Sequence, residues 1–282
     1  MFADMRETLK KLRDALRPIY GRGESEAIIR ILFHYLKGWN TTDMLIHENE
    51  ELSPYLKGEI EAILIRLKNY EPIQYITGEA RFHGMELKVR PGVLIPRPET
   101  EQLVDIITDD AGNREDLRVL DVGTGSGCIA IALARSLKFP TITALDISDI
   151  AVATAKENAM ALKADINIVK ADIFEWKPRQ QFDIIVSNPP YIDESEKPEM
   201  ERNVLDFEPP RALFVPDNDP ICFYRQIGNM ATGSLPTGGM LYFEINPRHC
   251  REIEQILATS GFNEIESLRD SFGRLRFIKA RK

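Results

Sequence analysis

Short apolar runs alternate with helical patterns from Leu117 to the C-terminus, and this alternation constrains the fold more than any other feature. Parallel strands need crossover connections, usually helices, so the pattern predicts a doubly wound, mostly parallel α/β sheet. The final two strands, IESLRD and GRLRFIKAR, are separated only by Ser271–Gly273, which predicts an antiparallel edge. The other strands are expected in LRVLDVG, TITALDI, INIVKAD, FDIIVSN and GGMLYFEIN, and helices in SGCIAIALARSL, AVATAKENAMALKA, PICFYRQIGNMAT and RHCREIEQILATSG.

The first 75 residues have a different, helical periodicity. Apolar residues recur three or four positions apart in the first helix, which Pro18 is expected to end. A second helix, in ESEAIIRILFHYLKGW, is expected to close at Gly38. A third begins after Ser53, a candidate N-cap in front of Pro54. These patterns predict a small helical bundle over residues 1–75.

A hairpin and a proline-rich connector separate the two patterns. The segment ARFHGMELKV alternates in polarity around His83 and Gly84, which predicts a two-residue hairpin turn. The next segment, PGVLIPRPETE, contains three prolines, and proline fixes φ, so we expect a stiff, non-helical stretch with the domain boundary in it. The predicted organisation is a helical domain over 1–75, a connector over 76–98 and an α/β domain over 99–282.

Charge and composition exclude several classes of protein. The chain has 282 residues with 36 Lys and Arg against 44 Asp and Glu, a net charge of −8. Binding along a phosphate backbone needs an excess of basic residues, so stable nucleic-acid binding is not expected. No apolar run approaches the roughly 18 residues of a membrane span, and no signal-peptide core is present, so we expect a cytoplasmic protein. Cys128, Cys222 and Cys250 lack metal-ligand spacing; we expect packed, reduced thiols and no metal.

A glycine-rich loop joins the first α/β strand to its helix. The loop, DVGTGSG, begins at Asp121 and ends at Gly127. Glycines allow the backbone to turn sharply and approach a ligand, and the helix N-terminus offers free N–H groups. Asp121 would repel a pyrophosphate but can pair with the ammonium of S-adenosylmethionine, whose sulfonium lies nearby. A turn without a ligand is the alternative. The candidate cofactor-binding residues here are Asp121, Gly123, Thr124, Gly125, Ser126 and Gly127.

Two further cofactor contacts are expected at the ends of the next strands. Asp146 ends the strand after the glycine loop, where a carboxylate can accept hydrogen bonds from ribose hydroxyls. Its alternative role is to cap the helix that begins near Ser148. Asp172 and Ile173 follow the third strand and could contact an adenine ring, although a plain loop is an equal alternative.

The sequence Asn188-Pro189-Pro190-Tyr191 follows the buried strand FDIIVS. Two prolines remove N–H donors and leave carbonyls to accept hydrogen bonds. The Asn188 side-chain oxygen and the Pro189 carbonyl can hold both hydrogens of a planar –NH2 group, and Tyr191 can stack on it. Such acceptors stabilise the positive charge that develops on the nitrogen during group transfer. We predict catalytic roles for Asn188, Pro189 and Tyr191, substrate contacts from all four residues and a cofactor contact from Asn188. An ordinary proline turn is the alternative.

These motifs together resemble those of class I S-adenosylmethionine-dependent methyltransferases, whose fold is Rossmann-like. More specifically, GVLIPRPETE, DVGTGSG, SNPPYI, FEPPRAL and DSFGRLRF resemble the bacterial release factor glutamine methyltransferases, the PrmC/HemK family. The resemblance implies methyl transfer to the glutamine amide nitrogen in the Gly-Gly-Gln motif of class 1 peptide release factors, with the helical domain recognising that protein. Asn246, in FEINPRH, stands where the family usually has glycine, so its role stays open.

Other activities remain as alternatives, and the roles of several charged residues stay open. Methyltransferases that act on the exocyclic amino group of adenine in DNA or RNA share the Asn-Pro-Pro-Tyr motif and are the principal alternative. A binding module and an NAD-dependent oxidoreductase fit the glycine loop less well. No histidine is assigned a catalytic role. Five charged residues are expected either at the rim of the pocket or in structural ion pairs: Arg97, Glu99, Glu208, Arg211 and Arg276.

Overall fold

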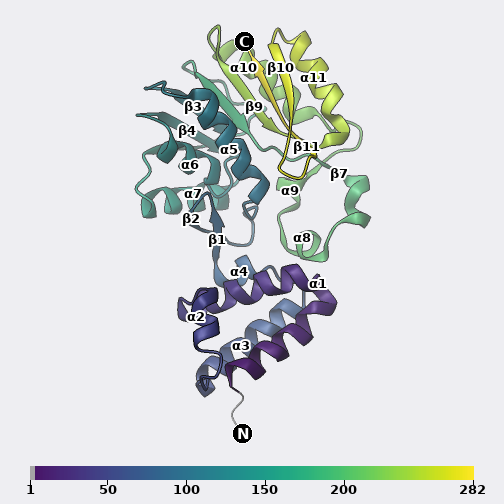
Figure 1. The fold of residues 1–282 in the computed structure, drawn as a ribbon. Coiled ribbons are helices and arrows are strands. Elements are labelled where there is room, and N and C mark those ends of the chain that lie inside the picture. The colour runs from purple at the N-terminus through teal and green to yellow at the C-terminus, as the bar shows by residue number, and fades with distance from the viewer. Residues whose placement is uncertain (1–3) are drawn as a thin grey trace. The chain divides into compact units, whose positions relative to one another are not determined.

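A computed structural model describes residues 4–282, and their contacts divide the chain into two compact units (Figure 1). The helical unit contains the chain up to Gly78 together with Glu201–Phe207. The sheet unit contains Glu79–Met200 and Glu208–Lys282. The expected connector over 76–98 therefore lies almost wholly in the sheet unit, and a short segment from the second half of the chain belongs to the helical unit.

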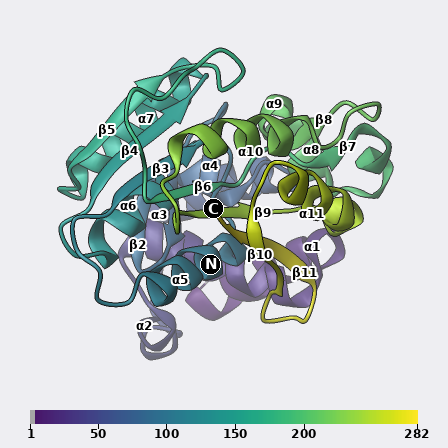
Figure 2. The same ribbon diagram turned by 90° about the horizontal axis from the view of Figure 1, so that it is seen from above.

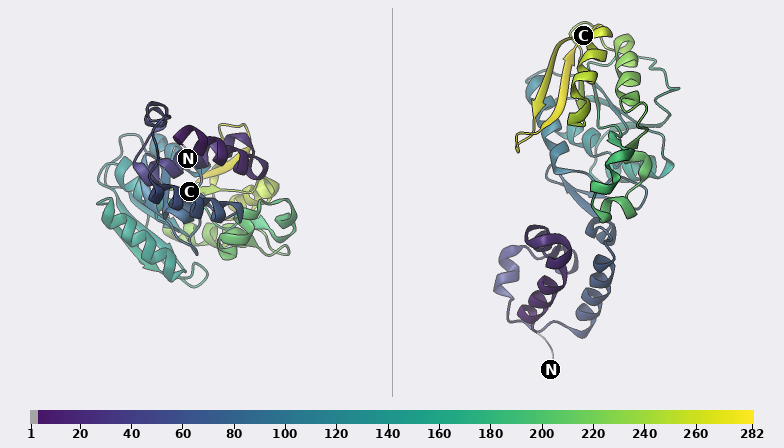
Figure 3. Two further views of the ribbon diagram at one scale, coloured as in Figure 1. Left: turned by 90° about the horizontal axis from the view of Figure 1, so that it is seen from below. Right: turned by 90° about the vertical axis from the view of Figure 1, so that its right-hand side faces the viewer.

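The helical unit has its own apolar core. Its helices are α1 (Met5–Lys37), α2 (Thr41–Ile46), α3 (Pro54–Lys68), α4 (Ile73–Thr77) and α8 (Arg202–Phe207); the first four are purple to blue in Figure 3. The Ser53 side chain accepts a hydrogen bond from the Leu56 amide, and Gly38 ends α1 in the left-handed conformation, so both predicted helix limits are confirmed. Buried leucines and isoleucines from α1 and α3 form most of the core.

The prediction that Pro18 ends the first helix is wrong. Helical hydrogen bonding continues past Pro18, and the break occurs at Gly21, whose φ of 71° and ψ of 177° are not helical. Glycine adopts positive φ without the steric cost that a side chain would impose. The long helix α1 is thus two helical segments that meet at Gly21.

The segment Glu201–Phe207 packs on the helical unit through side chains. The Arg202 guanidinium lies 4.2 Å from the centroid of the Tyr70 ring. Glu201 also contributes, after burial, to raising the pKa of Glu24. No local pattern predicts that this segment joins the helical unit, because it is short and has no periodicity.

The sheet unit is built on a seven-stranded sheet in the order β10-β11-β9-β6-β3-β4-β5. Strands β9, β6, β3, β4 and β5 pair in parallel, and β11 runs antiparallel to both β9 and β10, so the predicted antiparallel edge is confirmed. The strands are β3 (Arg118–Val122), β4 (Thr141–Asp146), β5 (Ile166–Lys170), β6 (Ile184–Ser187), β9 (Met240–Glu244), β10 (Asn263–Arg269) and β11 (Leu275–Arg281).

Alternate residues of the strands pack into two separate cores, one on each face of the sheet. Helices cover both faces (Figure 2). In β3, for example, Val119 packs with α5 and α6, whereas Leu120 packs with α10 and α11. The helices are α5 (Pro98–Ala111), α6 (Cys128–Ser136), α7 (Asp149–Ala161), α10 (Cys222–Ser234) and α11 (Cys250–Thr259). Helix α5 corrects the sequence analysis: PETE is helical, because Pro98 occupies the first helical position, where its missing N–H is not needed.

Smaller elements complete the sheet unit. Strands β1 (Glu79–Phe82) and β2 (Met85–Lys88) form the predicted hairpin with its turn at His83 and Gly84. The chain after Pro190, which the sequence analysis left unassigned, contains the paired strands β7 (Ile192–Asp193) and β8 (Phe214–Val215), the helix α9 (Pro210–Leu213) and the short helix η1 (Glu194–Glu199). A further short helix, η2 (Pro247–His249), precedes α11.

None of the helices formed by residues 4–282 combines the length and the apolar character that a membrane span requires.

Candidate cofactor and substrate site

A cavity of about 240 Å³ opens in the sheet unit at the carboxyl ends of β3, β4 and β6. Strand β3 lies between β4 and β6, so the order of the parallel strands changes direction there, and ligands of doubly wound folds bind at such a point. Of the residues predicted from sequence, ten line the cavity: Gly123, Thr124, Gly125, Ser126, Asp146, Asp172, Ile173, Asn188, Pro189 and Pro190. Asp121, Gly127 and Tyr191 do not line it.

The glycine loop is held by backbone bonds to the neighbouring strand. The amides of Gly123 and Thr124 both donate to the carbonyl of Leu145, at 2.8 and 3.0 Å. Gly123 and Gly125 have positive φ, and a Cβ at either would meet no atom within 4 Å, so this loop leaves open space for a ligand. At Gly127, by contrast, a Cβ would lie 3.1 Å from Ile131 and 3.2 Å from Ala155. Gly127 therefore allows close packing of α6 and α7.

Asp121 lies beneath the loop and is fully buried. Its Oδ2 accepts a 2.7 Å hydrogen bond from the Thr124 hydroxyl, whereas Oδ1 has no hydrogen-bond partner among the described residues. Burial raises the pKa of Asp121 to about 7, the Thr124 bond opposes the shift, and Asp146 adds to it. A buried carboxylate with an unused oxygen is suited to a nearby positive charge.

Asp146 joins the loop to the next helix. Its Oδ2 accepts from the Gly125 amide and its Oδ1 from the Ser148 amide, both at 2.9 Å. Ser148 itself caps α7 by accepting from the Ala151 amide. Each carboxylate oxygen has two lone pairs, so both backbone bonds leave acceptor capacity facing the cavity. Ser148, not Asp146, is therefore the N-cap of α7, and Asp146 keeps acceptor capacity for a ligand in the cavity.

The far end of the cavity is mostly apolar. Ile173 is buried, and Phe174 and Phe223 meet edge to face with their ring centroids 5.2 Å apart. Asp172 accepts a 2.9 Å bond from the Phe174 amide, which fixes this turn. Sequence reasoning named Asp172 and Ile173 but missed the two phenylalanines and Leu145 and Ile147, because nothing local marks an aromatic or aliphatic residue as part of a cavity wall.

The residues present fit S-adenosylmethionine. The open space at Gly123 and Gly125 admits a close backbone contact, and the buried carboxyl group of Asp121 beneath the loop suits a nearby cation. Asp146 lines the cavity with acceptor capacity that suits a hydroxyl group, and the apolar part of the lining suits an adenine ring.

Asn188 directly follows β6 and lines the cavity. Its Nδ2 donates to the hydroxyl of Thr100, which lies in the first turn of α5, at 3.2 Å. Thr100 in turn donates to Glu244 Oε2, the last residue of β9, at 2.7 Å. Sequence reasoning missed Thr100 and Glu244, although Thr100 lies within the PRPET segment that carried the family resemblance.

Tyr191 lies at the edge of the apolar core rather than on the cavity wall. Its hydroxyl donates to Glu244 Oε1 at 3.1 Å. Burial raises the pKa of Tyr191, and the Glu244 charge adds to this shift, so the hydroxyl is a stable donor. The contact of Tyr191 with a substrate amide stays a prediction.

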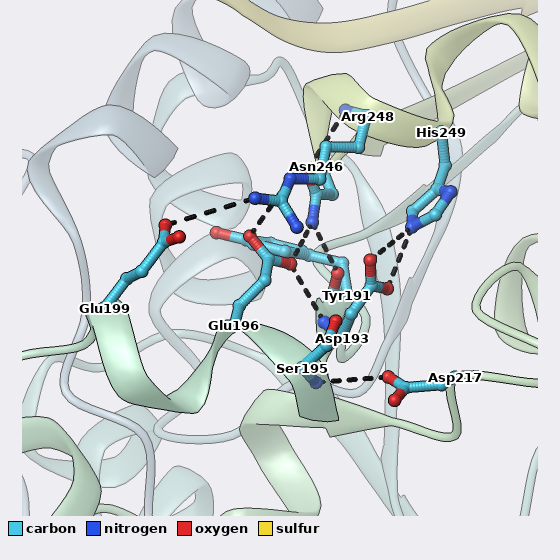
Figure 4. A network of polar contacts seen from close by, with 9 residues as sticks. All are labelled: Tyr191, Asp193, Ser195, Glu196, Glu199, Asp217, Asn246, Arg248 and His249. Carbon is cyan, nitrogen blue, oxygen red and sulfur yellow. Dashed lines mark hydrogen bonds and ion pairs between the residues drawn. The ribbon is translucent and has the colours of Figure 1, made fainter.

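A network of side chains anchors the segment that follows Pro190 (Figure 4). Asn246 Nδ2 donates to the Tyr191 carbonyl at 3.1 Å and to Glu196 Oε1 at 2.8 Å. His249 Nε2 lies 2.8 Å from Asp193 Oδ1, and both side chains are nearly buried. Asn246, whose role the sequence left open, thus ties this segment to the turn after β9.

The charged residues expected at the rim have separate roles. Arg97 forms a 2.5 Å ion pair with buried Glu208, and Glu208 also accepts from the Ile95 amide at 3.1 Å. Both residues belong to the sheet unit, so this is a structural ion pair within that unit. Arg97 and Arg211 line the cavity, whereas Arg276 pairs with Asp270 at 3.4 Å.

The cysteines are free thiols, as expected. Cys250 lies in the core around α10 and α11, and Cys128 packs against the core on the opposite face. Burial raises the pKa of Cys128 to about 12, so its thiol is protonated beside the cavity.

Two family models match the chain. The PrmC N-terminal domain matches residues 7–78, and the Methyltransferase small domain matches residues 98–206. The release factor glutamine methyltransferase of Bacteroides thetaiotaomicron is 42% identical over 273 residues, which are 96% of this chain and 98% of that protein. The chain belongs to the release factor glutamine methyltransferase family. A Streptococcus pneumoniae member of this family is 38% identical and aligns over 91% of this chain and 92% of its own.

Solved structures with lower sequence identity share the fold. A T. thermophilus 16S rRNA methyltransferase in complex with AdoMet and guanosine matches with a TM-score of 0.53 at 21% identity, covering 72% of this chain and 49% of that chain. A methyltransferase from Pyrococcus furiosus gives the same TM-score at 15% identity, over 79% and 98%. The Rossmann-like class I methyltransferase fold and the use of S-adenosylmethionine, expected for the family, are confirmed.

Proposed function

We propose that this chain transfers the methyl group of S-adenosylmethionine to the side-chain amide nitrogen of the Gly-Gly-Gln glutamine in class 1 peptide release factors. Family membership over nearly the whole chain supports the substrate class. The structural observation that carries the proposal is the Asn188 amide, whose nitrogen is held by Thr100 while its oxygen is left to accept from a substrate at the cavity.

The proposed chemistry depends on two acceptors. Bound S-adenosylmethionine supplies an electrophilic methyl group. Asn188 Oδ1 and the Pro189 carbonyl accept the two hydrogens of the glutamine –NH2 and aim its nitrogen at that methyl, with the reacting atoms about 3–3.5 Å apart. As the nitrogen forms its bond to carbon and the carbon–sulfur bond breaks, the same oxygens stabilise the charge that the nitrogen gains. S-adenosylhomocysteine would leave as a neutral thioether, and the methylated nitrogen, which is strongly acidic while it carries a positive charge, would lose a proton to water.

Contacts to the cofactor are assigned from the cavity. Asp121 would stabilise the ammonium, the loop from Gly123 to Ser126 would pass along the methionine part, and Asp146 would accept from the ribose. Asp172 and Ile173 would border the adenine. Tyr191 would support the loop and contact the substrate through its ring, since its hydroxyl is bonded to Glu244.

We also propose that the helical unit recognises the release factor. Leu45, Ile46, Tyr55 and Ile65 of this unit expose 61–77% of their surface, which suits an apolar contact with a protein. Replacing Tyr55 and Ile65 by serine in the full chain should raise KM for the release factor and leave kcat and cofactor affinity unchanged. Met160→Ser is the matched control, because Met160 is equally exposed on the sheet unit. An unchanged KM in the double variant would contradict this role. Deleting the unit is a poorer test, because it removes the partner of Glu201–Phe207.

Methyl transfer to competing substrates tests the activity directly. Purified release factor, the same factor with its motif glutamine changed to alanine, adenine-containing DNA and tRNA are offered side by side with labelled cofactor. We expect label only in the unmodified factor, and no stable retention of either nucleic acid given the net charge of −8. Label in DNA or tRNA but not in the factor would replace this proposal with adenine methylation.

A further inference from the structure

We propose that Thr100 and Glu244 are positioning residues that determine which end of the Asn188 amide faces the substrate. The inference rests on the proposed function and deepens it. An asparagine side chain presents an oxygen at one end and an –NH2 at the other, and only the oxygen can accept a hydrogen bond from the substrate amide. If the side-chain amide of Asn188 were flipped, its –NH2 group would face the –NH2 group of the substrate and could not accept a hydrogen bond from it.

The sheet places Glu244 beside Asn188. Strands β6 and β9 are parallel neighbours, with Ser187 opposite Phe243, so the next residues along the two strands are Asn188 and Glu244. Thr100 reaches the same place from the first turn of α5. Three segments that are distant in sequence therefore meet at the carboxyl ends of β6 and β9. Thr100 and Glu244 are both nearly fully buried.

Counting donors fixes the direction of the chain of hydrogen bonds. The Thr100 hydroxyl has one hydrogen, which it gives to Glu244 Oε2 at 2.7 Å. Toward Asn188 it can then only accept, so the group that lies 3.2 Å from it must be the Asn188 –NH2. The Asn188 oxygen is left at the opposite end. Donation to a hydroxyl that is itself bonded to a carboxylate also polarises the amide and strengthens its oxygen as an acceptor.

Two hydroxyl groups donate to the carboxylate of Glu244. The Tyr191 hydroxyl donates to its other oxygen at 3.1 Å, so both carboxylate oxygens receive a hydrogen bond from a hydroxyl. Burial raises the pKa of Glu244 above its ordinary value, and the bonds from Thr100 and Tyr191 and the charge of Arg276 offset only part of that rise. Tyr191 thereby acts on Asn188 through Glu244.

Thr100→Val tests the proposal because valine keeps the shape and removes the hydroxyl. We expect kcat for release factor methylation to fall about tenfold, the effect of one lost hydrogen bond, with little change in the Kd of the cofactor. Thr100→Ser restores the hydroxyl and should recover most of the lost kcat. Thr154→Val is the matched control, because Thr154 is fully buried in α7, donates only to the Ile150 carbonyl and does not line the cavity.

A double-mutant cycle with Asn188→Ala separates positioning from general stability. If Thr100 acts through Asn188, Thr100→Val adds no further loss of kcat once Asn188 is alanine. An equal fold-loss in both backgrounds, or a Thr100→Val enzyme with wild-type kcat, would overturn the proposal. The wild-type protein is measured in parallel. If it fails to methylate the release factor, the proposed function is wrong; if it succeeds while the cycle is additive, only this inference is wrong.

Discussion

The glycine loop and the Asn188 loop follow the carboxyl ends of two neighbouring strands, β3 and β6, but different bonds hold the two loops in place. Backbone amides of the glycine loop bond to Leu145 and Asp146 on the adjacent strand. The Asn188 loop is held through side chains: Thr100 accepts from Asn188 and donates to Glu244. Thr100 and Glu244 lie 88 and 56 positions from Asn188 in sequence.

This difference has a functional consequence. A loop made of glycine and backbone bonds leaves open space and suits a large cofactor that is bound and released. Side chains packed around Asn188 fix the direction of one acceptor, which suits a step that depends on orientation. We therefore expect changes in the glycine loop to affect binding, and changes around Asn188 to affect kcat.

Asn188→Ala should give the largest effect on activity, and it tests whether changes around Asn188 affect kcat rather than cofactor binding. Removing one preorganised acceptor should lower kcat by about 10²–10³, because the substrate amide can rotate and the developing charge loses a partner. Cofactor affinity, measured by calorimetry on the same preparation, should change far less. A kcat within about tenfold of wild type would show that Asn188 is not a catalytic residue.

Asp146→Ala should change binding instead. Losing a charge-assisted contact to the ribose costs about 1.5–3 kcal/mol, which corresponds to a rise of roughly 10- to 150-fold in the Kd of S-adenosylmethionine. At saturating cofactor kcat should recover. Asp146→Asn, which keeps one oxygen, is the matched variant. Its Kd for S-adenosylmethionine should lie between the values of the wild type and of Asp146→Ala. Unchanged calorimetric affinity for the alanine variant would remove the ribose assignment.

Cofactor affinity should also depend on pH through Asp121. Its pKa of about 7 exceeds the ordinary value of 3.8, so Asp121 is largely protonated below neutral pH and binds a cation poorly. We expect the Kd at about pH 6 to be roughly tenfold higher than at pH 8, with a plateau above pH 8. The contribution of Asp121 to stability has the opposite sense: it is complete near pH 4 and is lost as the pH rises through 7. Asp121→Asn should abolish both dependences; a pH-dependent Kd that persists in this variant would place the titrating group elsewhere.

Asn246→Ala should have the smallest effect on activity. It removes the donor to the Tyr191 carbonyl and to Glu196 and so loosens the segment after Pro190, which costs about 1–3 kcal/mol in the free energy of unfolding. We expect kcat to fall by less than tenfold, because Thr100 still orients Asn188. Exposed Asn229→Ala provides the baseline in chemical denaturation. A loss of kcat as large as that of Asn188→Ala would mean that the network in Figure 4, rather than Thr100, orients the amide.

Local sequence patterns determined the strands, the main helices, the antiparallel edge and the two loops that carry the motifs. They did so because the periodicity of burial and the backbone needs of glycine and proline act over a few residues. Only the tertiary structure decided that α1 breaks at Gly21, that Glu201–Phe207 belongs to the helical unit, and that Thr100 and Glu244 meet Asn188. Those outcomes depend on which strands become neighbours and on which buried donor finds which acceptor, and a side chain carries no local mark of a partner that is distant in sequence.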